Sequence, residues 1–330
     1  MTTFLRLLTA TIAGLMAIAN VSFAGSDWPN KPVTMVVPFS PGGGVDQTLL
    51  PLKPILEKKL GQSFLYSYKK GASGRIGWEI VNANGKEGYA VTALVLPHLV
   101  NTTIFAKPKY KFDDITPVAV ITGDVPIWFT HKDSPYNSMA DLVADAKKRP
   151  GEVKLAIGSF TGEHYIGVAL LEQNLGIKFR KVNVKGGSKV MSNVVGKHFD
   201  VGVSRPTSIL RVRDDIKGLG IVSAKKSPLY PEAETFDKQL PASKIPHLRA
   251  AFGFAAHKSF KENDPEGFAK LVKAVKEALH SPEYQTALKR GGREFTYMGP
   301  DEAVKFVADM HASMRKYKPL IDAAKKKKKK

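Results

Sequence analysis

Short apolar segments alternate along the chain with stretches whose apolar residues recur every three or four positions. The segment from Pro32 to Pro38 is rich in β-branched residues and bounded by prolines, which is typical of a buried strand. After a glycine turn, four leucines between positions 49 and 60 fall on one face of a helix. Pro51 and Pro54 lie within this pattern, so either the helix is kinked or its regular part begins near Pro51.

The same alternation of strand and helix patterns continues through the chain. Further strands are predicted for residues 64–68, 89–96, 118–122, 127–130, 153–157, 179–184, 201–203 and 218–223. Helices are predicted for residues 76–82, 138–148, 165–174, 190–195, 265–280 and 300–320. Strands that alternate with helices form mainly parallel sheets flanked by helices. The pattern therefore predicts an α/β protein, and 330 residues are enough for two such units with a cleft between them.

The first 24 residues differ in character from the rest. They hold one charge, Arg6, then the apolar run Leu7–Ile18, and they end in Ser22-Phe23-Ala24, with small residues where a signal peptidase reads the chain. This layout predicts a cleavable secretory signal over residues 1–24. A membrane anchor is the alternative, but the apolar run is too short to span a bilayer comfortably. We therefore expect an exported, soluble chain.

Composition narrows the classes of function. The chain has no cysteine, which excludes disulfides, thiolate zinc sites and cysteine nucleophiles. Its formal net charge is +20, and a body this basic attracts anions. No nucleic acid partner is expected, because the chain is predicted to be exported and its basic residues are scattered. The run 325–330 is expected to be a disordered lysine tail or an addition, with contact to a membrane surface as the alternative.

A glycine turn, Gly42-Gly43-Gly44, lies between the first predicted strand and a helix. Glycines let the main chain approach a ligand closely. The first N–H groups of a helix are unpaired and favour a negative group. The turn therefore predicts a cradle for a carboxylate or phosphate. A nucleotide loop is disfavoured because the segment lacks a Gly-Lys-Ser/Thr ending, whereas an ordinary tight turn remains an alternative.

A second turn of the same kind spans Gly158 to His164, again after a predicted strand and before a helix. Its Ser159 and Thr161 either contact a ligand or only cap the helix. Ligands of open α/β sheets bind outside the carboxyl ends of the strands, so two facing lobes would close both turns around one solute. A third segment, Val182 to Ser188, contains Lys185, which either pairs with an anion or is only solvated.

Several stretches, in this order and spacing, are distinctive when taken together. They are Trp28-Pro29, Pro38-Phe39-Ser40-Pro41-Gly42-Gly43-Gly44-Val45-Asp46, Gly71-Ala72-Ser73-Gly74-Arg75-Ile76-Gly77, Lys185-Gly186-Gly187 and Phe252-Gly253-Phe254-Ala255. From about Trp28 to Lys318 the chain resembles the Bug-type extracytoplasmic solute receptors of tripartite tricarboxylate transporters. The resemblance implies a two-lobed periplasmic-binding-protein-like fold (type II) whose chain crosses between the lobes twice. Residues 25–125 and 226–324 are then expected in lobe 1 and residues 126–225 in lobe 2.

The resemblance implies a periplasmic receptor that is not an enzyme and needs no cofactor or metal. Such a receptor captures a small organic acid and delivers it to integral membrane transporter subunits. The ligands of the family are di- and tricarboxylates, aromatic acids or acidic amino acids. Ligand contacts are expected from Phe39, Ser40, Gly42, Gly43, Asp46, Ser159, Thr161, Gly162, His164, Lys185, Gly187 and Ser204.

The chain departs from the family pattern in three places. Glu163 stands in the second turn where small hydroxyl residues are usual, and Asn183-Val184 replaces a common Pro-Tyr pair. Arg205 follows Ser204 where an Asp-Asn type stretch is common. A carboxylate in an anion site is unfavourable unless it faces a positive group. Glu163 is therefore expected to point away, to pair with Lys185 or Arg205, or to hold an ammonium group of the ligand.

Two other functions stay open at the level of sequence. An exported α/β hydrolytic enzyme would use Ser159 or Ser204 as nucleophile and His164 as base, but the Gly-x-Ser-x-Gly pattern of a nucleophile elbow is absent. A solute sensor of the same fold, not coupled to transport, leaves no motif to recognise. His98 and His164 are expected to form hydrogen bonds rather than to bind a metal, because no spacing such as His-Glu-x-x-His occurs.

Overall fold

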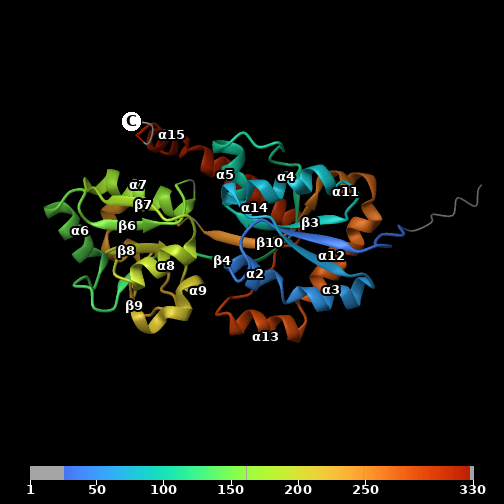
Figure 1. Cartoon of the computed structure of the whole chain (residues 1–330), viewed down its shortest axis with the longest axis horizontal. Helices are drawn as coiled ribbons and strands as arrows, with labels where there is room; N and C mark the ends of the chain where they lie inside the picture. The colour runs from blue at the N-terminus through green and yellow to red at the C-terminus, as the bar shows by residue number, and fades with distance from the viewer. Residues whose placement is uncertain (1–25, 161, 248, 328–330) are drawn as a thin grey trace, which may run out of the picture.

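The computed structural model describes residues 26–160, 162–247 and 249–327. They form two lobes, each built on a five-stranded sheet flanked by helices (Figure 1). This architecture confirms the two-lobed α/β fold predicted from the sequence. The predicted signal peptide and Thr161 lie outside the described residues. Within the described ranges, every helix is too short or too polar to cross a membrane.

The sheet of the first lobe has the strand order β2-β1-β3-β10-β4. Its strands are β1 (Val33–Val37), β2 (Phe64–Tyr68), β3 (Ala90–Leu96), β4 (Ile115–Asp124) and β10 (Ala250–His257). Strand β1 pairs in parallel with β2 and β3, whereas β10 runs antiparallel to β3 and β4. Strands β3 and β10 are buried along their whole length, as expected for strands covered by helices on both faces.

The sheet of the second lobe has the strand order β7-β6-β8-β5-β9. Its strands are β5 (Ile127–His131), β6 (Lys154–Ile157), β7 (Arg180–Asn183), β8 (Val201–Ser204) and β9 (Ile216–Ile221). Strand β6 pairs in parallel with β7 and β8, whereas β5 runs antiparallel to β8 and β9. The two lobes therefore repeat one plan, in which a single strand near the edge runs against the other four.

The reversed strands, β5 and β10, are the ones that directly follow a crossing between the lobes. A strand that enters a lobe from the crossing has to run away from the other lobe, while the remaining strands run toward it. The prediction of mainly parallel sheets is confirmed, and the antiparallel strand in each lobe is the correction to it.

The helices cover the faces of both sheets (Figure 1). In the first lobe they are α2 (Gly44–Leu49), α3 (Leu52–Leu60), α4 (Arg75–Asn84), α5 (His98–Phe105), α11 (Lys258–Asn263), α12 (Pro265–Leu279), α13 (Pro282–Arg290), α14 (Pro300–Arg315) and α15 (Lys318–Lys327). In the second lobe they are α6 (Met139–Lys148), α7 (Glu163–Leu175), α8 (Gly187–Val195), α9 (Pro206–Ile209) and α10 (Phe236–Gln239). Short 3-10 helices are η1 (Ala72–Gly74), η2 (Leu210–Asp215) and η3 (Pro241–Ser243).

Proline divides the first helical region into two helices. Helix α2 ends at Leu49, and Pro51 is the N-cap of α3. Pro54 lies in the first turn of α3, where a missing N–H removes no intrahelical hydrogen bond. Of the two alternatives left open by the sequence, the regular helix begins near Pro51.

The second crossing lies later than the sequence predicted. The first crossing is the short link Val125-Pro126 between β4 and β5, and the return lies between η3 and the start of β10. Helix α10 and η3 contact α6, α7 and β9 of the second lobe. Phe236 of α10 is buried, with its ring centre 6.0 Å from that of Trp128 in β5. The segment 236–243 thus belongs to the second lobe rather than to the first, because its aromatic anchor packs there.

The C-terminal helix also differs from the prediction. Helix α15 contacts α5 of the first lobe and α7 of the second. It continues through residue 327, three residues into the run predicted as a disordered tail, because each residue added to an existing helix needs no new nucleus. Residues 328–330 lie outside the described part of the chain.

Candidate ligand-binding site

The first glycine turn joins the carboxyl end of β1 to α2, and Asp46 holds its shape. Gly42 has a φ of +71°, a left-handed conformation that glycine adopts without steric cost. The N–H of Gly42 donates to Oδ2 of Asp46 at 2.8 Å, and the hydroxyl of Tyr68 donates to Oδ1 at 2.7 Å. Gly43 is extended and immediately precedes α2, and Ser40 is exposed. Because both carboxylate oxygens of Asp46 accept hydrogen bonds within the lobe, Asp46 positions the turn.

A buried arginine lies directly under this turn. Arg293 is 6% exposed, and its Nε donates to Oγ1 of Thr48 at 3.1 Å. Its Nη2 donates to the carbonyl oxygen of Gly44 at 3.3 Å. In the described part of the chain, no carboxylate oxygen lies within 4.0 Å of this guanidinium. Burial lowers the pKa of Arg293, but a guanidinium stays charged at neutral pH. Sequence analysis missed this cation, since no motif surrounds it.

The second turn joins the carboxyl end of β6 to α7, whose first residue is Glu163. Glu163 is 2% exposed and forms an ion pair with Arg205, which follows β8. Burial raises the pKa of Glu163, but Arg205, His164, His98 and a backbone hydrogen bond together outweigh burial and lower the pKa to about 2. The carboxylate also occupies the end of α7 that favours a negative group. Of the roles that the sequence left open for Glu163, the structure shows the pairing with Arg205.

Two histidines line the same buried region. Nε2 of His164 lies 3.4 Å from Oε1 of Glu163, and burial lowers the pKa of His164 to about 4. His98 comes from the first lobe, at the start of α5, and burial lowers its pKa as well. Both imidazoles are therefore uncharged at neutral pH, although the Glu163 carboxylate favours their protonation. From the sequence, His98 was expected only to form hydrogen bonds rather than to bind a metal, and it was not among the expected ligand contacts.

The two turns meet around His98. The His98 ring lies edge-on to Phe39 of the first turn, with ring centres 5.4 Å apart. A Cβ built on Gly162 of the second turn would lie 3.9 Å from Cε1 of His98. Arg205 makes another contact between lobes, because its guanidinium carbon lies 5.6 Å from the ring centre of Phe252 in β10. Phe39, Gly162 and Arg205 thus border one shared region between the lobes.

The first crossing between the lobes adjoins this region. Oδ2 of Asp124, the last residue of β4, accepts a hydrogen bond at 2.6 Å from Oγ1 of Thr207 in the second lobe. The N–H of Val125 donates to Oδ1 of the same carboxyl at 3.0 Å. Burial raises the pKa of Asp124. A hydrogen bond across the crossing therefore couples the two lobes next to the candidate site.

The third predicted segment, Val182 to Ser188, is hydrogen-bonded to the second turn. The N–H of Gly186 donates to the carbonyl oxygen of Gly158 at 3.0 Å. Lys185 has a φ of +59°, and its side chain is exposed. Gly187 opens α8, and Ser204 is buried at the end of β8. Among the described residues, no group of three or more His, Asp or Glu side chains could hold a metal ion.

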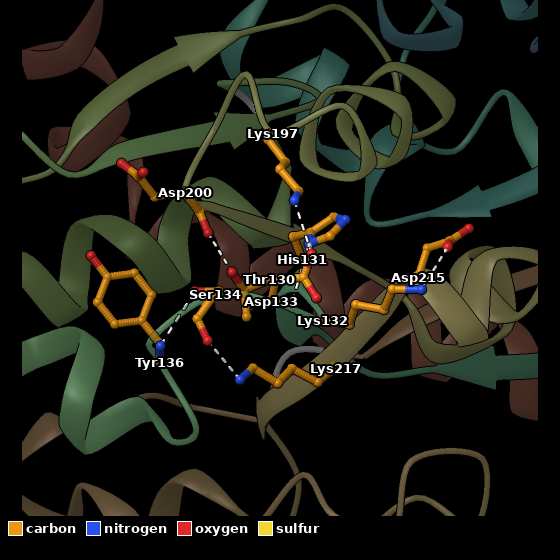
Figure 2. A network of polar contacts seen from close by, with 10 residues as sticks. All are labelled: Thr130, His131, Lys132, Asp133, Ser134, Tyr136, Lys197, Asp200, Asp215 and Lys217. Carbon is orange, nitrogen blue, oxygen red and sulfur yellow. Dashed lines mark hydrogen bonds and ion pairs between the residues drawn. The ribbon is translucent and has the colours of Figure 1, made fainter.

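Another cluster of charged groups lies at the opposite end of β5 from the crossing (Figure 2). Lys197 Nζ lies 2.9 Å from Oδ2 of Asp133, and Lys132 Nζ lies 3.5 Å from Oδ1 of Asp215. The side chains of these residues are about half exposed or more, between 49% and 61%. Exposed ion pairs contribute little to stability because water screens them. This cluster joins loops at the far end of the second lobe, and its ion pairs are open to water.

Comparison with known proteins agrees with this geometry. The model of the tripartite tricarboxylate transporter family receptor, TctC, matches residues 52–325. Protein BugT of Bordetella pertussis is 27% identical over 310 residues, which cover 92% of this chain and 93% of that protein.

Solved structures show the same fold. The periplasmic binding protein BugD superimposes with a TM-score of 0.78 at 22% identity, over 89% of this chain and 99% of that chain. MatC of Rhodopseudomonas palustris, solved with bound malate, superimposes with a TM-score of 0.76 at 21% identity, over 88% and 100% of the two chains. The family match covers most of the chain, and the two lobes have the architecture of these receptors. The protein therefore belongs to the TctC family of tripartite tricarboxylate transporter receptors.

Proposed function

We propose that the protein captures a small organic acid between its two lobes and delivers it to the membrane subunits of a tripartite transporter. The observation that carries the proposal is the meeting of the two turns at His98, with Phe39 on one side and Gly162 on the other. Each turn precedes a helix, and the first amides of a helix favour an anion. We assign the ligand's carboxylate to the first turn, at Ser40, Gly42 and Gly43.

Charge supports an acidic ligand. Arg293 lies under the first turn with no carboxylate within 4.0 Å in the described ranges. The whole chain carries a formal net charge of +20, which raises the local concentration of anions and speeds their capture. MatC, which has the same fold, was solved with bound malate, a small organic acid. The pattern of residues 1–24 supports export to the compartment in which such a receptor works.

Capture is proposed to work by closure about the two crossings, at residues 125–126 and between η3 and β10. A ligand that contacts both turns interacts with the closed arrangement of the lobes more strongly than with an open one, and so shifts the population toward closure. The Arg205–Phe252 contact and the Thr207–Asp124 hydrogen bond then add protein contacts between the lobes. Closure presents one shape of the receptor to its membrane partner.

A thermal-shift screen of organic acids and amino acids tests the proposal. A ligand that binds only the folded state stabilises it by about 2.7 kcal/mol at 100 times its Kd. At least one small carboxylate is expected to raise the melting temperature at such a concentration. If no acid stabilises the protein while an ester is hydrolysed, the receptor function is wrong and the hydrolase alternative gains support.

A matched pair of glycine variants tests the first turn. Gly43 and Gly299 both precede a helix with extended backbone, at φ −80° and −70°, so a side chain strains neither backbone. A Cβ on Gly43 would point at the turn, 3.2 Å from the Ser40 carbonyl oxygen, whereas one on Gly299 would make ordinary contact with Tyr297. Gly43→Leu is expected to weaken acid binding at least tenfold, and Gly299→Leu to leave it unchanged. Equal affinities in the two variants would remove the first turn from the site.

A further inference from the structure

We infer that the second-lobe side of the site, formed by Glu163, His164 and Arg205 and approached by His98 of the first lobe, selects a ligand group that forms hydrogen bonds but carries no negative charge. The ligand would then be a monocarboxylate with a hydroxyl, amide or ammonium group at its distal end. The inference rests on the proposed function, because it takes the ligand's carboxylate to lie at the first turn.

Buried polar atoms that form no hydrogen bond gather at this side of the site. In the described part of the chain, Oε2 of Glu163, Nε of Arg205, Nε2 of His164 and Nδ1 of His98 are buried and accept or donate no hydrogen bond. They come from α7, from the segment after β8 and from α5 of the other lobe. Folded proteins leave few buried polar atoms unpaired. Four such atoms in one region between two lobes indicate a polar group that binds there.

The charges in this region already balance. Glu163 and Arg205 form an ion pair, and burial keeps His98 and His164 uncharged at neutral pH. A second ligand carboxylate beside the uncovered Oε2 of Glu163 would meet a like charge at low dielectric, which is unfavourable. A hydroxyl or amide group instead offers a donor to Oε2 and an acceptor to Nε of Arg205. An ammonium group offers donors to Oε2 and to an unprotonated imidazole nitrogen.

The first-lobe side has the opposite character. Arg293 has no carboxylate within 4.0 Å in the described ranges, and Gly44 brings the main chain within reach of its Nη2. A Cβ on Gly44 would lie 3.1 Å from that nitrogen. One end of the site thus offers a buried guanidinium without a directly paired carboxylate, although Asp124 acts on it from farther away. The other end offers a neutral network with unused hydrogen-bonding atoms. This asymmetry predicts an asymmetric ligand.

A trapped water molecule does not account for all four atoms. A cavity of about 10 Å³ is lined by residues that include Glu163, His164, Trp128, Gly167 and Ile245. That volume is about the least that holds one water molecule. Neither Arg205 nor His98 lines it. A water there could serve Glu163 and His164 only, so the atoms of Arg205 and His98 still need another partner.

Calorimetric titration with a matched set of four-carbon acids tests the inference. The set is succinate, succinamate, 4-hydroxybutyrate and 4-aminobutyrate, with the five-carbon series in parallel to allow for length. At pH 7, at least one monocarboxylate is expected to bind ten times more tightly than the dicarboxylate of equal length. Dicarboxylates that bind as tightly as the monocarboxylates or more tightly would overturn this inference and leave the proposed function standing. If no acid of either kind binds, the proposed function fails and this inference with it.

Substitution of Glu163 sharpens the test. Glu163→Gln keeps the size of the side chain, removes its charge and frees Arg205 for a ligand carboxylate. The ratio of dicarboxylate to monoamide affinity is expected to rise at least tenfold. Glu172→Gln is the matched control, because Glu172 lies on the same helix and pairs with Lys181 outside this region. An unchanged ratio in folded Glu163→Gln would overturn the inference. If that variant does not fold, the titrations of the unsubstituted protein decide alone.

Discussion

Asp46 and Glu163 are two buried carboxylates at the starts of two helices, and the structure uses them differently. Asp46 follows the first glycine turn and accepts hydrogen bonds on both oxygens, from the Gly42 N–H and the Tyr68 hydroxyl. Glu163 follows the second turn and pairs through one oxygen with Arg205, while its other oxygen accepts no hydrogen bond from the described residues. Both side chains are at most 5% exposed. Burial alone therefore does not separate a structural carboxylate from one that we propose faces a ligand.

Hydrogen-bond satisfaction separates the two. A buried carboxylate whose oxygens all have partners within its own lobe stabilises a loop, and its loss is felt mainly as lost stability. A buried carboxylate with a free oxygen at a contact between lobes is costly to retain, which is expected where a site is built for a ligand. The comparison predicts that substitutions at Asp46 act on folding alone, whereas substitutions at Glu163 act on ligand choice as well as on stability.

The largest effect is expected when Arg205 alone is removed. Arg205→Met leaves Glu163 buried without its cation, and breaking one side of a buried pair costs about 3–5 kcal/mol. The double variant Glu163→Gln, Arg205→Met removes both charges and should unfold closer to the original protein. Urea unfolding at pH 7 measures both free energies. Equal losses of unfolding free energy in the single and double variants would show that Glu163 and Arg205 do not stabilise each other.

The next effect is expected at Asp46. Asp46→Ala leaves the Gly42 N–H and the Tyr68 hydroxyl without their acceptor, and a hydrogen bond to a charged group is worth about 1.5–3 kcal/mol. The free energy of unfolding should fall by about that amount, while the preference among acids stays as before. Tyr68→Phe removes only one of the two bonds and serves as the control with a smaller loss. A changed acid preference in Asp46→Ala, with stability intact, would contradict the comparison.

Acid should weaken the folded state through the second turn. His164 has its pKa lowered by burial to about 4, so the unfolded chain takes up a proton below pH 6.5 that the folded chain refuses. Stability is therefore expected to fall between about pH 6.5 and 4, by at most about 1.4 kcal/mol per pH unit for this group. His98 adds to the same trend.

The ion pair extends the loss to lower pH. The pKa of Glu163 is held at about 2, so the stability it contributes is complete above the ordinary glutamate value and is lost as pH falls from about 4.3 toward 2. Urea unfolding across this range measures how steeply the free energy of unfolding changes with pH. His164→Gln should make this dependence flatter between pH 6.5 and 4. A slope that His164→Gln leaves unchanged would place the titrating group elsewhere.

The smallest effect is expected at the exposed network of Figure 2. Lys197→Ala removes an ion pair whose two side chains are both 61% exposed, and such pairs are screened by water and salt. No measurable change in urea midpoint or in acid affinity is expected. A clear loss of affinity in this variant would mean that the far end of the second lobe takes part in binding.

Local sequence patterns were sufficient for most of the fold and for both turns. The glycine turn after β1 and the turn before α7 were predictable because a strand, small residues and a helix follow one another directly. Strand β10 (Ala250–His257) was not, since its four alanines and one glycine favour strands only weakly, and its neighbours β3 and β4 stabilise it. The second crossing was misplaced because its position depends on tertiary packing. Only the packing of Phe236 against Trp128 shows that this segment belongs to the second lobe.

The site itself depends on contacts that no local pattern contains. Arg293 reaches the first turn from 249 residues away along the chain. Arg205 and Glu163 are 42 residues apart in the sequence. The sequence left their pairing as one of several alternatives, and only the folded structure shows it. His98 belongs to the other lobe and meets Gly162 only in the folded protein. Residue types and turns are local features, whereas the partner of a buried charge is set by tertiary structure.

The most direct measurement is a crystal structure of the protein with the acid that stabilises it most. The account predicts a carboxylate within hydrogen-bonding distance of the amides around Gly43. It also predicts a hydroxyl, amide or ammonium group next to Oε2 of Glu163 and Nε of Arg205. An acid bound away from both turns, or one whose second carboxylate lies against Glu163, would contradict it.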